Sequence, residues 1–147
     1  MSEQSQHAIE LHHQKYNCAQ AVFCTYAGQL GLDEKTAFAL SEGLGGGIGG
    51  RRQGTCGAVT GMVLLAGLIN SSGDIQKAVT KQETYQLVTR LMEEFEKKNS
   101  SSLCYELLGG NGKPKLRSCD GCIEDACQLV EEHLLPLLKE KQAADQK

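Results

Sequence analysis

The stretch from Gly43 to Gly61 reads Gly-Leu-Gly-Gly-Gly-Ile-Gly-Gly-Arg-Arg-Gln-Gly-Thr-Cys-Gly-Ala-Val-Thr-Gly and contains nine glycines and one cysteine. Because glycine has no Cβ atom, such a run lets the backbone turn sharply and approach other groups closely. An unbroken apolar segment, Met62 to Ile69, follows it. The pattern predicts a glycine loop that delivers Cys56 to the first turn of a buried helix over residues 55–69.

Two local features of this stretch carry further expectations. A thiolate at Cys56 would lie near the positive end of the helix dipole, which lowers the pKa of a thiol. Arg51 and Arg52, directly upstream, would lower that pKa further. Gly57 and Gly61 lie about one helical turn apart, so the central helix should present a face on which another helix can pack closely.

The rest of the chain is predicted to be helical, because apolar residues recur at spacings of three and four. Besides the central helix, helices are expected over residues 3–28, 34–43, 74–99, 101–108 and from 118 onward. Asp33 and Asp74 are expected N-caps, and Pro136 should kink or end the last helix. No segment shows the alternation of a half-exposed strand. The chain, residues 1–147, is therefore predicted to be one all-α domain, a bundle of five to six helices around the buried central helix.

The predicted helices also indicate which side chains face the core. The periodicity predicts inward-facing side chains at Ala37, Leu40, Ile75, Ala78, Val79, Tyr85, Val88, Leu91, Met92 and Phe95. Cys18 is placed in the middle of the first helix, on its apolar face. The adjacent residues His12 and His13 should diverge on a helix, so we interpret them as solvated side chains that cannot both serve one metal ion.

Composition argues against several classes of protein. The net charge is −3 with both signs mixed, and there is no tryptophan and few other aromatic residues, which argues against a nucleic-acid binder. No apolar run approaches the roughly 20 residues that span a bilayer, and the polar N-terminus lacks an apolar signal region. Residues 45–50 match G-x-G-x-x-G, but no apolar strand precedes them, which argues against nucleotide binding. We therefore expect a cytoplasmic protein with no membrane span.

The seven cysteines are many for a chain of 147 residues. In a reducing compartment they are expected to be metal ligands or redox thiols rather than structural disulfides. Cys119 and Cys122 form a C-x-x-C pair at a predicted helix N-terminus, a known way to make an acidic thiol. The pair has neither the βαβ setting of a thioredoxin nor a second C-x-x-C to complete a zinc ribbon.

The order of these motifs closely resembles the C_GCAxxG_C_C family of redox-active proteins. The resemblance covers nearly the whole chain and is carried by Asn17–Val22, Gly31–Glu34, Gly45–Gly50, Cys56–Gly61, Cys104 before Leu107-Leu108-Gly109, and Cys119 before Ile123 and Ala126. It implies that the family's four cysteines are represented here by Cys18, Cys56, Cys104 and Cys119. Genes of this family are often found beside transporter genes, and related domains occur fused to redox modules. Cys24, Cys122 and Cys127 lie outside the pattern, although Cys122 could replace or assist Cys119.

Three functions are open at this point. The first is a redox thiol protein, a candidate thiol oxidoreductase, with Cys56 as the low-pKa thiolate and Cys18, Cys104 and Cys119 as resolving or partner thiols. The second is a Cys₄ site of the same four residues, with Cys122 as a further candidate ligand, that binds zinc or an iron–sulfur cluster. The third is a non-enzymatic bundle that binds a transporter or another protein through the glycine loop. Short helices around a nearly all-apolar central helix also predict a homodimer.

Overall fold

The computed structural model describes residues 1–145, and every regular element within them is a helix. The all-α prediction is confirmed. The α-helices are α1 (Glu3–His12), α2 (Cys18–Ala27), α3 (Glu34–Ser41), α4 (Gly57–Asn70), α5 (Lys81–Asn99), α6 (Cys104–Leu107), α7 (Cys119–Leu129) and α8 (Leu135–Asp145). Within this described part, no helix combines the length and the apolar character that crossing a bilayer requires.

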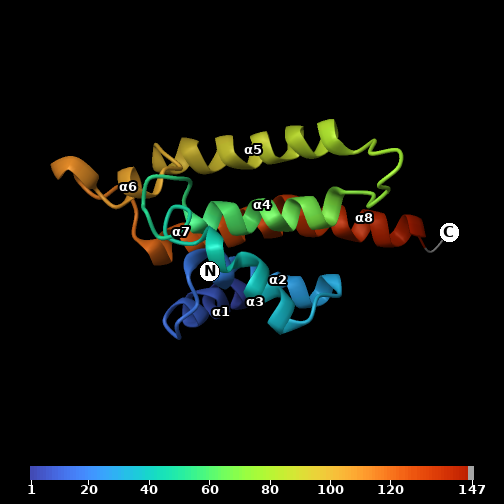
Figure 1. The fold of residues 1–147 in the computed structure, drawn as a ribbon, viewed down its shortest axis with the longest axis horizontal. Coiled ribbons are helices and arrows are strands. Elements are labelled where there is room, and N and C mark those ends of the chain that lie inside the picture. Colours follow the sequence, from blue (N-terminus) through green and yellow to red (C-terminus); the bar gives the residue numbers. More distant parts are fainter. Residues whose placement is uncertain (146–147) are drawn as a thin grey trace.

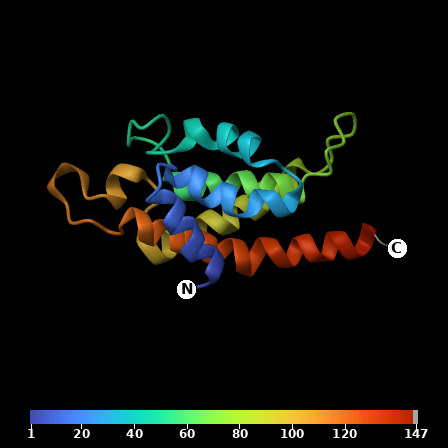
Figure 2. The ribbon, with the colours of Figure 1, turned by 90° about the horizontal axis from the view of Figure 1, so that it is seen from below.

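Helix α4 is the central helix, as predicted. It runs through the middle of the molecule with α5 on one side and α1, α2 and α3 on the other (Figure 1), and it packs on α2, α5, α7 and α8. The predicted close approach occurs at Gly61, where an added Cβ atom would lie 2.7 Å from the carbonyl oxygen of Ala19 in α2. The glycine loop, α6 and the beginning of α7 gather at one end of the bundle (Figures 1 and 2).

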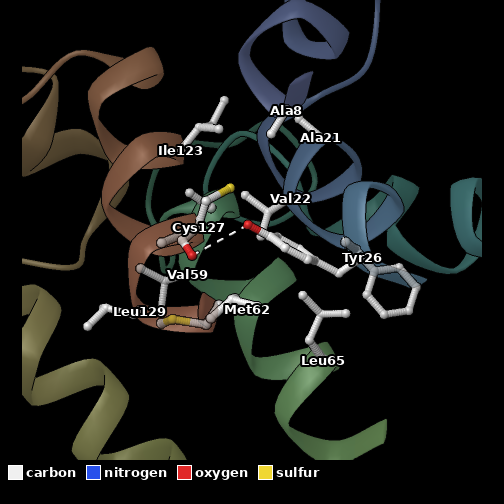
Figure 3. Close-up of a cluster of buried hydrophobic side chains, with 14 of the residues drawn as sticks. Ala8, Ala21, Val22, Tyr26, Val59, Met62, Leu65, Ile123, Cys127 and Leu129 are labelled. Carbon is white, nitrogen blue, oxygen red and sulfur yellow. Dashed lines mark hydrogen bonds between the residues drawn. The ribbon is translucent and has the colours of Figure 1, made fainter. Parts of the chain in front are cut away.

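The core between α2, α4 and α7 is built around the fully buried ring of Tyr26. The Tyr26 hydroxyl donates to a carboxylate oxygen of Glu131 at 2.7 Å and lies 3.5 Å from the carbonyl oxygen of Cys127 (Figure 3). Cys127 has no exposed surface, and burial raises the pKa of its thiol to about 12. This cysteine therefore packs as a small apolar residue and is kept out of thiolate chemistry.

The single first helix predicted over residues 3–28 is wrong, because the chain breaks between α1 and α2. Lys15 adopts a φ of 88°, which ends helical geometry. Asn17 then caps α2: its side chain accepts from the Gln20 N–H, and the Gln20 side chain accepts from the Asn17 N–H. This capping box makes Cys18 the first residue of α2 rather than a mid-helix residue.

The helix predicted over residues 74–99 begins later, at Lys81. Asp74 does accept backbone N–H groups from Gln76 and Lys77, but Ala78 has a φ of 48°, so the turn does not propagate. Side-chain hydrogen bonds of this local kind compete with helix formation. The inward direction predicted for five side chains is also wrong, since these lie in exposed positions: Leu40, Ile75, Ala78, Val79 and Tyr85. Leu91 and Phe95 are buried as predicted.

Pro136 does not end the last helical segment. A π-helical turn over Val130–Leu134 joins α7 to α8, and the Leu135 N–H donates to the Val130 carbonyl five residues earlier. Proline lacks an N–H group and its ring crowds the preceding turn of a regular helix. The wider π turn directly before Pro136 accommodates the ring, so α8 continues to Asp145.

Candidate functional site

The glycine loop is held against the segment before α6 by two backbone hydrogen bonds. The Cys56 N–H donates to the Ser102 carbonyl at 2.7 Å, and the Cys104 N–H donates to the Gly54 carbonyl at 2.9 Å. Gly47 adopts a φ of 74°, and an added Cβ atom there would lie 2.7 Å from the Cβ atom of Cys104. Glycine is thus required at this position for the loop to lie against Cys104.

Five cysteines line one cavity of about 200 Å³ at this end of the bundle, namely Cys18, Cys56, Cys104, Cys119 and Cys122. The rest of the wall is formed by His12, Asn17, Gly46, Arg52, Gly57, Leu107 and Leu108. Four of these cysteines occupy helix starts: Cys18 begins α2, Cys104 begins α6 and Cys119 begins α7, while Cys56 is the N-cap of α4. Helix N-termini carry partial positive charge, so this arrangement favours thiolates.

Cys18 and Cys119 form one thiol pair. A hydrogen bond from Cys18 lowers the pKa of Cys119 to about 6, against the effect of burial, and the charges of His12 and Lys115 lower it further. The same hydrogen bond, together with burial, raises the pKa of Cys18. The pair therefore shares one proton, with Cys119 as the thiolate and Cys18 as the thiol.

Cys56 and Cys122 form a second, more deeply buried pair. A hydrogen bond from Cys122 lowers the pKa of Cys56, and the N–H groups of Ala58 and Val59 in the first turn of α4 act in the same direction. The pKa of Cys122 is raised by its hydrogen bond to Cys56 and by burial. The lowered pKa expected at Cys56 is thus present, but a neighbouring thiol is its main cause.

The arginines upstream of Cys56 act differently from the expectation. Arg51 is exposed, and its guanidinium bonds the side chain of Gln53. Burial and the negative charges of the Cys56 and Cys119 thiolates raise the pKa of Cys104. Arg52 faces Cys104, and its positive charge partly offsets this rise. The loop turns between Arg52 and Cys56, so proximity in sequence does not carry over to space.

The sulfur atoms are arranged as pairs rather than as a closed tetrahedron. In the part of the chain that the structure describes, no three cysteine sulfurs all lie within 4.8 Å of one another. A tetrahedral zinc site with bonds of about 2.3 Å would hold four sulfurs about 3.8 Å apart. An iron–sulfur cluster spaces its cysteine ligands more widely, so that alternative stays a prediction.

The prediction that His12 and His13 diverge and cannot serve one metal ion is wrong, because a ring nitrogen of each and a carboxylate oxygen of Asp120 lie within 4.8 Å of one another. His13 is exposed, as predicted, whereas His12 is half-buried. The Nδ1 atom of His12 lies 3.1 Å from one carboxylate oxygen of Asp120, and the Nε2 atom of His13 lies 2.8 Å from the other. The Nε2 atom of His12 lies 3.7 Å from the Cys18 sulfur. This cluster was not predicted, because one uninterrupted helix was expected over residues 3–28. In the structure α1 ends at His12 and packs on α7, which carries Asp120.

Comparison with known families agrees with the resemblance found in the sequence. A family model described as "Putative redox-active protein (C_GCAxxG_C_C)" matches residues 16–133. The chain belongs to this family. No curated protein and no solved structure matches it.

Within this C_GCAxxG_C_C protein, the cavity brings together the four pattern cysteines and adds Cys122. Cys122 acts mainly on Cys56, whose pKa it lowers. The remaining two cysteines lie elsewhere: Cys24 interacts with Ser41, burial raises its pKa, and Cys127 is enclosed in the core. His12 and His13 precede the matched residues, so they are features of this chain beyond the family match.

Proposed function

We propose that this member of the redox-active family performs thiol–disulfide exchange, with Cys18 and Cys119 as the reacting dithiol. The observation that carries the proposal is that Cys18 and Cys119 line the same cavity, where Cys18 lowers the pKa of Cys119 to about 6. The thiolate is the nucleophile in disulfide exchange, and a thiol with a pKa near ambient pH attacks most effectively. Cys119 is half-buried at the cavity wall, whereas Cys56 and Cys122 are buried.

The two thiols of this pair take different roles. Cys119 attacks an external disulfide, and Cys18, which keeps its proton until then, resolves the mixed disulfide that results. Two electrons pass from the protein to the external disulfide, and a Cys18–Cys119 disulfide is left behind. The reverse sequence would make the protein an oxidant of dithiols.

The more deeply buried pair, Cys56 and Cys122, extends the same chemistry. Cys56 and Cys119 line the same cavity, and the charge of the Cys119 thiolate raises the pKa of Cys56. The Cys56 thiolate would attack the Cys119 sulfur of the Cys18–Cys119 disulfide and release the Cys18 thiolate. Cys122 would then attack Cys56 and release Cys119, which leaves a Cys56–Cys122 disulfide. Cys104, which also lines the cavity, stays a predicted partner thiol.

Disulfide mapping tests the proposal. Fully reduced protein is treated with glutathione disulfide, quenched by alkylation and digested, and we expect a Cys18–Cys119 linkage. Cys18→Ala should stop this linkage and accumulate glutathione on Cys119. Cys24→Ala, the same substitution in the same helix but away from the cavity, should behave as the unmodified protein. Absence of any Cys18–Cys119 disulfide would overturn the proposal.

The metal alternative is decided by the same preparation. Protein purified without oxygen is assayed for colour, iron and zinc before any oxidant is added. Thiol–disulfide exchange predicts seven alkylatable thiols and no stoichiometric metal. One equivalent of zinc, or iron with the absorption of a cluster, would instead support a Cys₄ site of Cys18, Cys56, Cys104 and Cys119 with Cys122 beside it.

We also propose a homodimer, a redox or transporter partner and a cytoplasmic location. The expected homodimer is supported by exposed apolar residues next to the turn between α4 and α5, where Ile75 is 94% exposed and shares a hollow with Tyr85. Light scattering that gives the mass of a monomer at high protein concentration would contradict the homodimer. A redox or transporter partner and a cytoplasmic location follow from the resemblance and the composition, and co-purification from a cell fraction tests both.

A further inference from the structure

His12 occupies a bridging position between a carboxylate and the thiol pair. Its Nδ1 atom faces Asp120 at 3.1 Å and its Nε2 atom faces the Cys18 sulfur at 3.7 Å, and its ring forms part of the cavity wall. The three residues come from α1, α7 and α2, so tertiary packing alone brings them together. The His12 side chain is 25% exposed, which shields these contacts from most of the solvent.

The carboxylate determines which ring nitrogen carries the proton. An ionised carboxylate can only accept hydrogen bonds, so the Nδ1 atom of His12 must be the donor to Asp120. Asp120 is kept ionised because hydrogen bonds from His13 and His12 lower its pKa, although burial acts in the opposite direction. In the neutral ring the Nε2 atom then carries a lone pair directed at the Cys18 thiol.

We propose that His12 is a catalytic general base that removes the proton from Cys18 when Cys18 resolves the mixed disulfide on Cys119, and that Asp120 positions its ring. This inference rests on the proposed thiol–disulfide exchange. A carboxylate, an imidazole and a thiol in this order form the arrangement that activates nucleophilic thiols in other contexts. His12 touches a reacting sulfur atom, whereas Asp120 acts only through His12.

The exchange proceeds through two successive attacks by protein thiolates. The Cys119 thiolate attacks a low-molecular-weight disulfide, forming a bond to one of its sulfurs and releasing the other as a thiolate. Cys18 then transfers its proton to the Nε2 atom of His12, and the Cys18 thiolate attacks the Cys119 sulfur. The Cys18–Cys119 bond forms, the second thiolate leaves, and the imidazolium returns the proton to it. The protein loses two electrons and the external disulfide gains them.

The need for a base arises from the pairing of the two thiols. In the reduced state the Cys18 thiol donates a hydrogen bond to the Cys119 thiolate, but that acceptor is lost once Cys119 is joined to another sulfur. Besides Cys18, the titratable groups around His12 are Asp120 and Cys119 from α7 and the adjacent His13, with Lys115 beside Cys119. Among the residues that the structure describes, the ring nitrogen that lies at hydrogen-bonding distance from the Cys18 sulfur is the Nε2 atom of His12.

His13 offers a matched control in the same cluster. It bonds the other oxygen of Asp120, at 2.8 Å, and its side chain is 61% exposed. Replacing it removes a histidine and one contact to the same carboxylate but leaves the contact between His12 and Cys18 in place. His12→Gln and His13→Gln therefore differ in the one contact that the inference uses.

The experiment follows closure of the mixed disulfide in a single turnover. Reduced protein is mixed with glutathione disulfide, quenched with acid at intervals, and the glutathionylated and internally oxidised forms are resolved by intact mass spectrometry. At pH 7 we expect His12→Gln to accumulate the mixed disulfide and to close it about 100-fold more slowly, within the range for loss of a general base. His13→Gln loses one contact to Asp120 but keeps the contact between His12 and Cys18, so it should close within a few-fold of the unmodified rate.

Raising the pH distinguishes a proton-transfer role from a structural one. Near pH 9.5, hydroxide removes the Cys18 proton directly, so closure in His12→Gln should return to within a few-fold of the unmodified rate. A deficit that persists at high pH would overturn the inference, as would unchanged closure in His12→Gln at pH 7. His12→Asn and Asp120→Asn, made in parallel and checked by circular dichroism, decide the question if His12→Gln does not fold.

Failure of the inference and failure of the proposed function give different results. If the unmodified protein forms no mixed disulfide and no Cys18–Cys119 bond, the exchange reaction itself is absent. If it forms both while His12→Gln matches its closure rate at every pH, exchange stands and the base is not His12.

Discussion

The backbone N–H of Cys56 donates a hydrogen bond of 2.7 Å to the carbonyl oxygen of Ser102. The contact joins the end of the glycine loop to the segment before α6 and forms one side of an isolated antiparallel bridge between Thr55 and Leu103. Because the bridge fixes the backbone on both sides, it positions Cys56 and Cys104 on the cavity wall without a sheet. The cavity therefore depends on how closely the glycine loop can lie against this segment.

Replacing Gly47 with alanine should destabilise the protein more than the same change at Gly49. Both residues have a positive φ, of 74° and 64°, so both substitutions carry a backbone cost of about 1 kcal/mol. At Gly47 the new Cβ atom would also lie 2.7 Å from the Cβ atom of Cys104 and the Cα atom of Arg52, whereas at Gly49 no atom lies within 4 Å. Urea unfolding should show an extra loss of about 1–3 kcal/mol for Gly47→Ala. Equal losses for the two variants would mean that the loop does not press on Cys104.

Replacing Gly61 with leucine should lower the free energy of unfolding by about 1–3 kcal/mol through overpacking. The first added atom already lies 2.7 Å from the Ala19 carbonyl oxygen and 3.2 Å from the Cβ atom of Val22. Gly67→Ala, in the same helix but with no atom within 4 Å of the added Cβ, should instead stabilise by about 0.5–1 kcal/mol. A melting temperature unchanged by Gly61→Leu would contradict the close packing of α2 on α4.

Cys119 should be alkylated before the other cysteines at mildly acidic pH. Its pKa of about 6 leaves much of it as thiolate at pH 6, whereas burial raises the pKa of Cys24 and brings that of Cys127 to about 12. The rate should therefore fall as the pH drops below about 6. The sequence predicted Cys56 as the low-pKa thiolate, but Cys56 is only 5% exposed, so we expect it to react after Cys119.

The cause of the Cys119 pKa can be tested separately by mass spectrometry of iodoacetamide-treated protein. Cys18→Ala removes the hydrogen bond that lowers the pKa most, so the pH at which Cys119 becomes reactive should move upward. Cys24→Ala should leave it unchanged. A profile that stays at pH 6 in Cys18→Ala would assign the effect to His12, Lys115 and the start of α7 instead.

Asp125 should make the fold sensitive to acid. Its side chain is 2% exposed, and hydrogen bonds from Lys98, Asn99 and Arg117 lower its pKa, although burial alone would raise it. Since the pKa is lower in the folded state than its unfolded value of about 3.9, the stabilisation is complete well above pH 4 and is lost as the pH falls through the folded pKa. Urea unfolding at pH 7 and pH 3 measures this loss.

Two substitutions separate the buried carboxylate from its exposed neighbour. Asp125→Ala should destabilise by about 3 kcal/mol at pH 7, because it leaves the Arg117 and Lys98 charges without their buried partner. Glu124→Ala removes a contact of 3.7 Å to Arg117 from a side chain that is 35% exposed, and should cost less than about 1 kcal/mol. Equal effects would mean that Asp125 is not the centre of this network.

Local patterns predicted much of the helical framework. The apolar run from Met62 to Ile69 predicted the central helix, and Asp33 caps α3 as expected. Patterns failed where a short segment could form either a helix or a local turn. The Asn17 capping box was a readable signal for the start of α2, and missing it hid both the position of Cys18 and the cluster around His12.

By itself, the sequence determined the all-α class, the central helix and the place of Cys56 before its first turn, because these follow from periodicity and from the backbone freedom of glycine. Only the tertiary structure decided which thiols pair. Cys18 meets Cys119 and Cys56 meets Cys122 because separate helices pack with their N-termini toward one cavity. The same packing carries His12 to Cys18. These contacts join residues that are about 6 to 101 positions apart in the sequence. They depend on where the helices break and on the directions in which they pack, and the spacing of residues along the chain does not encode either.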